Sequence, residues 1–190
     1  SCKAPISVRY PIVEAVTGAL TALTMWHFGP TVQALAAIAM VWALVTLFLI
    51  DADTQLLPDQ ITLPLLWLGL LLNLQGWFAP LADAVIGGAA GYLVLWTVNV
   101  IFTMVRGQAG MGHGDFKLMG ALGAWFGWQA LPALILMSSI VGAVIGGLML
   151  VVQRKGRDTA FPYGPYIAGA GLIVLFLGPD VLPLGLVARH

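Results

Sequence analysis

The stretch VQALAAIAMVWALVTLFLI at residues 32–50 contains no charged side chain and is followed directly by Asp51. Its length is close to the ~20 apolar residues that cross the hydrocarbon core of a bilayer as a helix. It is apolar on all sides, which is typical of a helix surrounded by lipid or protein rather than by water. Because a backbone in lipid has no water to bond, such a segment must be helical. The stretch therefore predicts a membrane-spanning helix.

Similar apolar runs cover most of the remaining chain. Hydrophobic residues make up 60% of the sequence and charged residues 8%, against about 25% charged residues in a soluble domain. Gly178 and Pro179 should end a helix within the last run. The sequence predicts an all-α fold, a polytopic transmembrane bundle of about six to seven hydrophobic helices. The further runs lie at residues 12–28, 61–78, 81–105, 116–128, 130–152 and 165–187.

Basic residues gather at one end of the predicted helices. The turns at the opposite end, near residues 29–30, 79–80 and 129, contain no Lys or Arg. An excess of Lys and Arg marks the cytoplasmic side of a membrane protein. We therefore expect a cytoplasmic N-terminus, with Asp51 and Asp115 on the same side. The basic residues placed there are Lys3, Arg9, Arg106, Lys117, Arg154, Lys155 and Arg157.

Charge and cysteine content exclude several classes of function. The formal net charge is zero, whereas nucleic-acid-binding proteins are strongly basic, so no nucleic-acid partner is expected. The single cysteine, Cys2, cannot form an internal disulfide framework. The chain begins with Ser1 rather than Met and shows no signal-peptide pattern. We interpret it as trimmed from a longer protein.

Two aspartates at the ends of apolar runs are the candidate catalytic residues. Asp51 closes one run and Asp115 opens another, so both lie near membrane depth. Charged residues in membrane segments are costly, and a functional role is the default hypothesis. Two carboxylates held close share a proton, so that one accepts a proton from water while the other polarises a carbonyl group. This chemistry needs no metal and no serine or cysteine nucleophile.

A glycine-rich segment precedes Asp115. Glycines alternate at positions 110, 112 and 114, so this backbone can adopt unusual conformations and allow close approach of another chain. A protease within a membrane needs such a place, because its helical substrate must be unwound at the site. The alternative interpretation is a flexible loop in which Asp115 caps the next helix.

Four segments, in order, resemble motifs of the type IV prepilin leader peptidases. The segment GMGHGDFKL at residues 110–118, followed by LGAW, is similar to the GxGD signature of these intramembrane aspartyl proteases. The segment IDADTQLLPD at 50–59 resembles their first aspartate motif. RYPIVE at 9–14 and PYGPY at 162–166 are similar to two further family segments. The resemblance extends over nearly the whole chain.

The resemblance implies an activity and a catalytic pair. The family cleaves the basic leader from prepilins and pseudopilins of type IV pilus and type II secretion systems, after a glycine and at the cytoplasmic face of the bacterial inner membrane. Asp51 and Asp115 match the catalytic aspartates. Gly112, Gly114 and the pair Gly164–Pro165 become candidates for substrate binding or loop support. Proteolysis by this pair requires no cofactor.

The resemblance also implies a longer parent protein. Many members N-methylate the new terminus with S-adenosylmethionine, and their front end holds four cysteines that bind zinc. Cys2 resembles the last of these, but one thiolate cannot form a four-ligand zinc site. Zinc binding and methyltransferase activity are therefore expected only in a full-length protein. Residues 1–11 are interpreted as the remnant of a cytoplasmic loop and residues 12–190 as the protease core.

Four other charged residues are candidates for substrate binding or support. Asp53 lies two residues after Asp51, on a different helix face, so only one of them should reach a given partner. Asp59 is interpreted as the N-cap of the helix that follows it. Lys117 is expected to extend toward the membrane interface, or else to tune the charge of Asp115. Glu14 could pair with a neighbouring helix or hold substrate.

Two other function classes remain open from the sequence. A cation- or proton-coupled transporter also uses intramembrane carboxylates, but its site should lie near the membrane midplane, often between inverted repeats. No repeat is visible, and the carboxylates lie at one face. A non-catalytic assembly factor with a decayed site is the third class, and the presence of both aspartates argues against it.

Overall fold

The computed structural model describes residues 7–107, 110–153 and 162–181, which form seven α-helices and no strand. This confirms the prediction of an all-α fold. The segments at Val32–Thr54, Leu81–Arg106 and Trp128–Leu148 are long and apolar enough to cross a membrane. The helices are α1 (Arg9–Phe28), α2 (Val32–Thr54), α3 (Asp59–Asn73), α4 (Leu81–Arg106), α5 (His113–Phe126), α6 (Leu131–Gln153) and α7 (Gly164–Leu177), with short 3₁₀ turns η1 (Trp128–Ala130) and η2 (Pro179–Val181).

The C-terminal ends of α2 and α3 differ from the predicted ends. α2 continues past Ile50 to Thr54, and the left-handed residue Gln55 then ends it, with its backbone N–H bonded to the Asp51 carbonyl. Asp51, which closes the apolar run, therefore lies in the last turn of α2. Helix α3 ends at Asn73, five residues before the predicted end at 78. The predicted break at Gly178 is confirmed, since α7 ends there with a φ of 84°.

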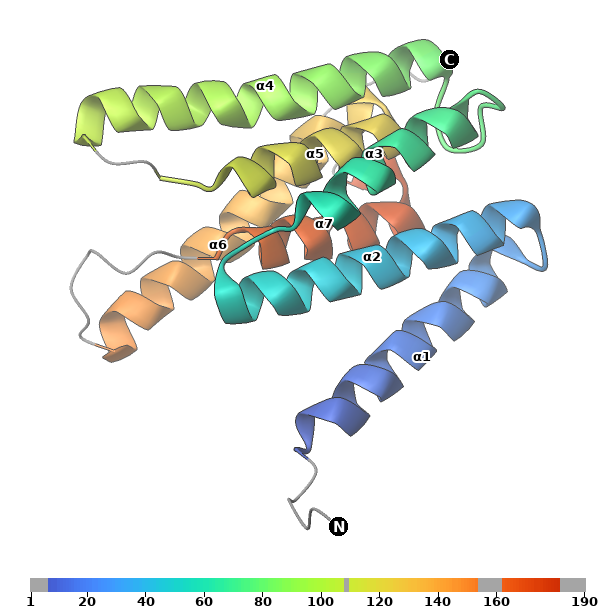
Figure 1. The fold of residues 1–190 in the computed structure, drawn as a ribbon, viewed down its shortest axis with the longest axis horizontal. Helices are drawn as coiled ribbons and strands as arrows, with labels where there is room; N and C mark the ends of the chain where they lie inside the picture. Colours follow the sequence, from blue (N-terminus) through green and yellow to red (C-terminus); the bar gives the residue numbers. More distant parts are fainter. Residues whose placement is uncertain (1–6, 108–109, 154–161, 182–190) are drawn as a thin grey trace.

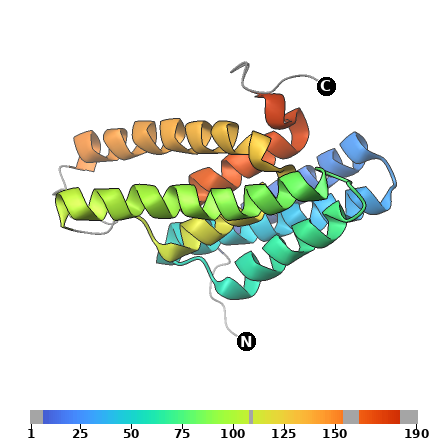
Figure 2. The ribbon, with the colours of Figure 1, turned by 90° about the horizontal axis from the view of Figure 1, so that it is seen from above.

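The bundle is built around α5. Every residue of α5 from Asp115 to Phe126 is buried except Lys117, which is partly buried. Helices α4 and α3 make the most extensive contacts with it, and α7 also packs against it (Figure 1). Seen from above, α7 lies between α6 and α2 (Figure 2). Helix α1 lies at the outside of the bundle, against α2 (Figure 1). The short helix that carries Asp115 is thus the core of the fold.

Glycines allow α4 and α5 to approach each other at backbone distance. A Cβ atom on Gly87 would collide with the Gly123 carbonyl oxygen, and one on Gly123 would collide with the Gly87 carbonyl oxygen. A Cβ atom on Gly91 would lie 2.7 Å from the Met119 carbonyl oxygen. Small residues spaced in this way are typical of close helix pairs in membranes. The contact fixes α5, and with it Asp115, against the longest helix of the bundle.

Asn73 and Trp125 anchor the end of α5 that lies away from Asp115. The buried Asn73 side chain donates to the carbonyl groups of Ala124 and Trp125, at 2.9 Å each. Its Oδ1 accepts the backbone N–H groups of Phe78 and Ala79, at 3.0 Å each. The Trp125 indole donates to the Leu65 carbonyl at 2.8 Å. Every polar atom of Asn73 is therefore bonded, as a buried amide requires.

Candidate active site

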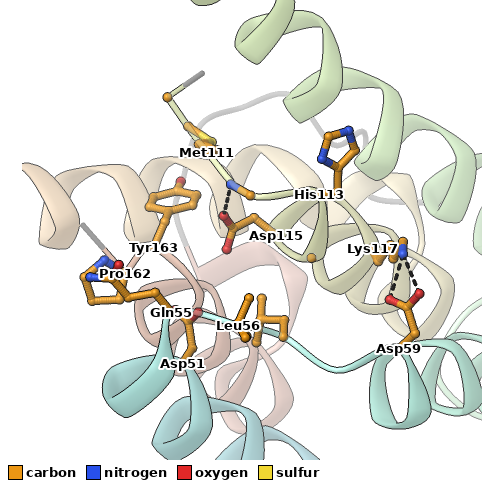
Figure 3. A pocket seen from close by; sticks show the side chains of 14 residues that line it. Asp51, Gln55, Leu56, Asp59, Met111, His113, Asp115, Lys117, Pro162 and Tyr163 are labelled. Atoms are coloured by element: carbon orange, nitrogen blue, oxygen red, sulfur yellow. Dashed lines mark hydrogen bonds and ion pairs between the residues drawn. The ribbon is translucent and has the colours of Figure 1, made fainter. Parts of the chain in front are cut away.

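A cavity of about 470 Å³ lies where the C-terminal end of α2 meets the N-terminal ends of α5 and α7. Asp51 and Asp115 both line it (Figure 3). The structure thus brings together two aspartates that lie far apart in the sequence. The other lining residues come from the α2–α3 linker, the start of α3, the glycine-rich segment, the first turns of α5 and the chain before α7: Gln55, Leu56, Leu57, Asp59, Gly110, Met111, Gly112, His113, Gly114, Lys117, Pro162 and Tyr163.

Asp51 is held against the start of α7. Its residue surface is 4% exposed, and its Oδ2 atom is buried without a hydrogen-bond partner among the described residues. A Cβ atom on Gly164 would lie 2.7 Å from this Oδ2 and 3.0 Å from Leu57 Cδ1. A buried carboxylate oxygen without a partner is costly unless it is protonated or meets a ligand. The Asp51 environment therefore suits a group that acts on substrate or water.

Asp115 both caps the start of α5 and lines the cavity. It is the third residue of α5, and its Oδ2 accepts the backbone N–H of Gly112, the residue that precedes the helix, at 3.1 Å. The helix-capping interpretation is thus correct for one oxygen. The residue is also 6% exposed and lines the cavity. Capping fixes the side chain while the carboxylate remains at the site.

Two carboxyl groups that share one cavity can divide the work of activating a water molecule between them. Asp51 is 4% exposed and Asp115 is 6% exposed, and both line the same cavity. Neighbouring carboxylates cannot both ionise easily, so one retains a proton. The ionised partner can take a proton from water, and the protonated partner can polarise a substrate carbonyl. Two carboxyl groups on one cavity are the groups from which aspartyl proteases draw their acid and their base.

Comparison with known proteins identifies the family. The model of the type IV leader peptidase family matches residues 38–147, a range that includes both aspartates. The chain belongs to the type IV leader peptidase family. The model of the bacterial peptidase A24 N-terminal domain matches residues 1–28. No solved structure matches this chain.

Three relatives are each named prepilin leader peptidase/N-methyltransferase. The protein from Stutzerimonas stutzeri is 51% identical over 181 residues, which are 95% of this chain and 63% of the relative. The relative from Pseudomonas aeruginosa is 52% identical over 95% of this chain and 62% of its own length. The one from Legionella pneumophila is 48% identical over 95% of this chain and 63% of its own length. The chain thus spans about three fifths of these relatives' length.

Glycines beside the two aspartates shape the cavity. Gly112 and Gly114 both line it, and a Cβ atom on Gly114 would lie 2.6 Å from Leu57 Cβ. Gly164 begins α7 against Asp51, and Pro165 follows it in the first turn, where proline favours helix initiation. The candidates for loop support therefore lie around the aspartate pair.

Asp53 and Glu14 lie away from the cavity that Asp51 and Asp115 line. The Asp53 carboxylate forms an ion pair with Arg9, with N–O distances of 2.9 and 2.7 Å, and this pair joins the end of α2 to the start of α1. Asp53 is not among the residues that line the cavity. Glu14 is exposed on α1 and lines a separate groove with Thr17 and Trp42. Neither carboxylate reaches the aspartate pair.

The expectation that Asp59 is the N-cap of α3 was wrong, and Asp59 instead pairs with Lys117. Pro58 occupies the N-cap position of α3, and no side chain caps this helix. The two Asp59 carboxylate oxygens instead accept from the Lys117 ammonium at 2.6 and 2.7 Å. The sequence could not show this pairing, because 58 residues separate the partners. The ion pair joins α3 to α5 at one side of the cavity (Figure 3).

The candidate metal ligand Cys2 lies outside the described residues. Within the described ranges, no group of three or more His, Cys, Asp or Glu side chains could hold a metal ion. His113 lines the cavity, where its ring contacts Phe116. No metal site is therefore assigned among the described residues.

The sequence analysis named Tyr163 only as part of the PYGPY segment, and it missed Asn99. The Tyr163 hydroxyl lies 2.8 Å from the Ser138 hydroxyl and 3.2 Å from that of Ser139, and these bonds join the cavity wall to α6. Asn99, a residue of α4, accepts hydrogen bonds from two backbone N–H groups of the glycine-rich segment. Asn99 is the single amide side chain in the largely apolar run 81–105, and this was the available signal, since polar side chains in such runs bond neighbouring backbone or helices.

Replacing Gly164 by Ala is expected to impair the site. The new Cβ atom would lie 2.7 Å from Asp51 Oδ2, so either the aspartate or α7 must shift. We expect a loss of peptidase activity of about tenfold to hundredfold, since small displacements of reacting groups have effects of this size. Steady-state kinetics on a prepilin peptide would measure it.

Gly169→Ala is the matched control. It adds the same methyl group to the same helix, at a site with no heavy atom within 4 Å. This variant should retain the parent's activity. Equal activity of both variants would show that the contact between Gly164 and Asp51 does not matter.

Proposed function

We propose that this chain is an endopeptidase that removes the leader peptide from prepilins or pseudopilins, with Asp51 and Asp115 as the catalytic pair. The observation that carries the proposal is the placement of both buried aspartates on one cavity, in a chain that belongs to the type IV leader peptidase family. The relatives' names indicate the substrate class.

The proposed reaction follows from the two protonation states of the pair. The ionised aspartate removes a proton from a water molecule as its oxygen attacks the scissile carbonyl carbon. The protonated aspartate donates to the carbonyl oxygen, and a tetrahedral diol forms. Breakage of the C–N bond then requires proton transfer to the leaving nitrogen, which yields a carboxylic acid and an amine. Since one proton is shared, the pair titrates as a unit.

We propose that the site opens at the cytoplasmic face of the bacterial inner membrane. Among the described residues, Arg9 begins α1, Arg106 ends α4 and Lys117 follows Asp115 in α5. These positions lie at the end of the bundle that holds the aspartates. Because Lys and Arg accumulate on the cytoplasmic side, the charges support this orientation. The basic leader of a substrate would then meet the site without crossing the membrane.

We propose that proteolysis needs neither metal nor S-adenosylmethionine, because the aspartate pair supplies both the acid and the base. Zinc binding and N-methylation are assigned to the full-length protein. The lipid bilayer is the proposed environment, and no nucleic-acid partner is proposed.

Chelators are accordingly expected to leave cleavage unchanged. Incubation with EDTA or 1,10-phenanthroline should keep kcat/KM within about twofold of the untreated enzyme, since general acid–base catalysis by carboxylates involves no metal. Initial rates on a prepilin peptide would measure this. A progressive loss that added Zn²⁺ restores would contradict the prediction and point to metal-assisted hydrolysis.

Assays of cleavage and of transport would separate the proposed peptidase from the alternative function, a cation- or proton-coupled transporter. The purified protein is placed in liposomes, and both prepilin processing and cation-dependent flux are measured. The proposal predicts a shortened prepilin and no flux above that of protein-free liposomes. Flux that depends on Asp51 or Asp115, without cleavage, would favour the transporter.

A further inference from the structure

Asn99 holds the glycine-rich segment that leads to Asp115. It belongs to α4, is 9% exposed, and its Oδ1 accepts the backbone N–H groups of Gly110 at 2.9 Å and Met111 at 3.0 Å. The next amide, that of Gly112, donates to Asp115 Oδ2 at 3.1 Å. Three successive backbone N–H groups are thus bound by side-chain oxygens, two by Asn99 and one by the catalytic candidate itself.

The same turn of α4 also supports the segment by packing. Phe102 lies three residues after Asn99, and a Cβ atom on Gly110 would be 2.8 Å from Phe102 Cδ1. Gly110 therefore lies directly on the aromatic ring while Asn99 binds its N–H. Helix α4 is in turn fixed against α5 by the close glycine contact at Gly87 and Gly123. The packed pair α4 and α5 thus holds both ends of the segment: α4 binds Gly110, and α5 begins directly after Gly112.

We propose that Asn99 is a positioning residue of the peptidase: its amide oxygen fixes Gly110 and Met111 so that the Gly112 N–H orients the Asp115 carboxylate toward Asp51. The proposal rests on the proposed function. Asn99 itself is not among the residues that line the cavity. It acts through the backbone, and its loss should alter catalytic turnover more than substrate binding.

The first test compares three variants by kcat and KM on a prepilin peptide. Asn99→Ala removes the acceptor and should lower kcat by about tenfold to hundredfold with KM within about threefold, because the reacting group is displaced. Asn99→Asp keeps an oxygen acceptor for both N–H groups and should retain at least about ten times the kcat of Asn99→Ala.

Asn73→Ala is the matched control. Asn73 is also buried and also accepts two backbone N–H groups, but it lies at the other end of α5. This variant should lower the thermal stability while the folded fraction keeps the parent's kcat. Equal kcat losses in Asn99→Ala and Asn73→Ala would show a general structural role and overturn the proposal. Equal kcat in Asn99→Ala and the parent would also overturn it.

The second test needs no substrate, so it separates failure of this proposal from failure of the proposed function. Hydrogen exchange of the Gly110 and Met111 amides should be slow in the parent protein and should accelerate at least about tenfold in Asn99→Ala. Exchange in the parent at the rate of an unstructured peptide would overturn the proposal, even if Asn99→Ala did not fold. Protected amides in a parent that cleaves no prepilin would instead contradict only the proposed function.

Discussion

Replacement of Asp115 or Asp51 by Asn is expected to lower kcat for prepilin cleavage by about 10³-fold or more. Each substitution keeps the size and shape of the side chain but removes the ability to exchange a proton. General acid–base groups typically contribute about 10²–10⁴-fold, and the two aspartates act on the same step. Because both residues are buried and line one cavity, neither should replace the other. Single-turnover cleavage assays in detergent would measure the loss.

Asp53→Asn is the matched control for this experiment. Asp53 lies two residues from Asp51 on α2, but it pairs with Arg9 and lies away from the cavity. Exposed ion pairs contribute about 0–1 kcal/mol, so this variant should remain folded and keep the parent's kcat within about threefold. Cleavage by Asp51→Asn at the parent's rate, or an equal loss in Asp53→Asn, would contradict the assignment of the catalytic pair.

Replacement of Gly87 by Ala is expected to cause the largest loss of stability. The added Cβ atom would collide with the Gly123 carbonyl oxygen and lie 2.7 Å from the Gly127 carbonyl carbon and the Trp128 nitrogen. Backbone atoms cannot rotate away, so α4 and α5 must separate. Overpacking typically costs about 1–3 kcal/mol, and we expect about 3 kcal/mol or more here. Thermal unfolding in detergent, followed by tryptophan fluorescence, would report it as a lower Tm.

Gly88→Ala provides a matched comparison for the packing prediction. A Cβ atom on Gly88 would meet Ala124 Cβ at 3.5 Å, an ordinary van der Waals distance. This variant should keep Tm within a few degrees of the parent, since an unstrained Gly→Ala change in a helix is neutral or stabilising. If the Gly87 and Gly88 variants unfolded at the same temperature, the close backbone contact between α4 and α5 would be refuted.

The sequence predicted where the helices lie better than it predicted whether each helix is buried in the protein or faces its surroundings. The charge-free run at 32–50 predicted α2, and the largely apolar run at 81–105 predicted α4, because lipid and protein interior both require apolar, hydrogen-bonded segments. The same property concealed the special position of α5. An apolar helix looks alike whether it faces lipid or protein, and only the extent of burial from Asp115 to Phe126 shows that α5 is the core.

In the candidate site as well, features that depend on local spacing were predictable from the sequence, whereas features that depend on tertiary packing were not. The two-residue spacing of Asp51 and Asp53 already indicated that only one of them reaches a given partner, and the structure places Asp51 on the cavity. The pairing of Asp59 with Lys117 depends on how α3 meets α5, which no local pattern encodes. The bonds from Asn99 to the glycine-rich segment likewise depend on tertiary packing.

The measurement that tests the central claim most directly is mass spectrometry of a purified prepilin after incubation with this chain in detergent. An Asp51→Asn, Asp115→Asn double variant serves as the control. The account predicts one cut, directly after the terminal glycine of the leader, with the parent chain and none with the double variant. An intact prepilin after incubation with the folded parent chain, or the same cut by the double variant, would contradict the claim that this aspartate pair is a leader peptidase active site.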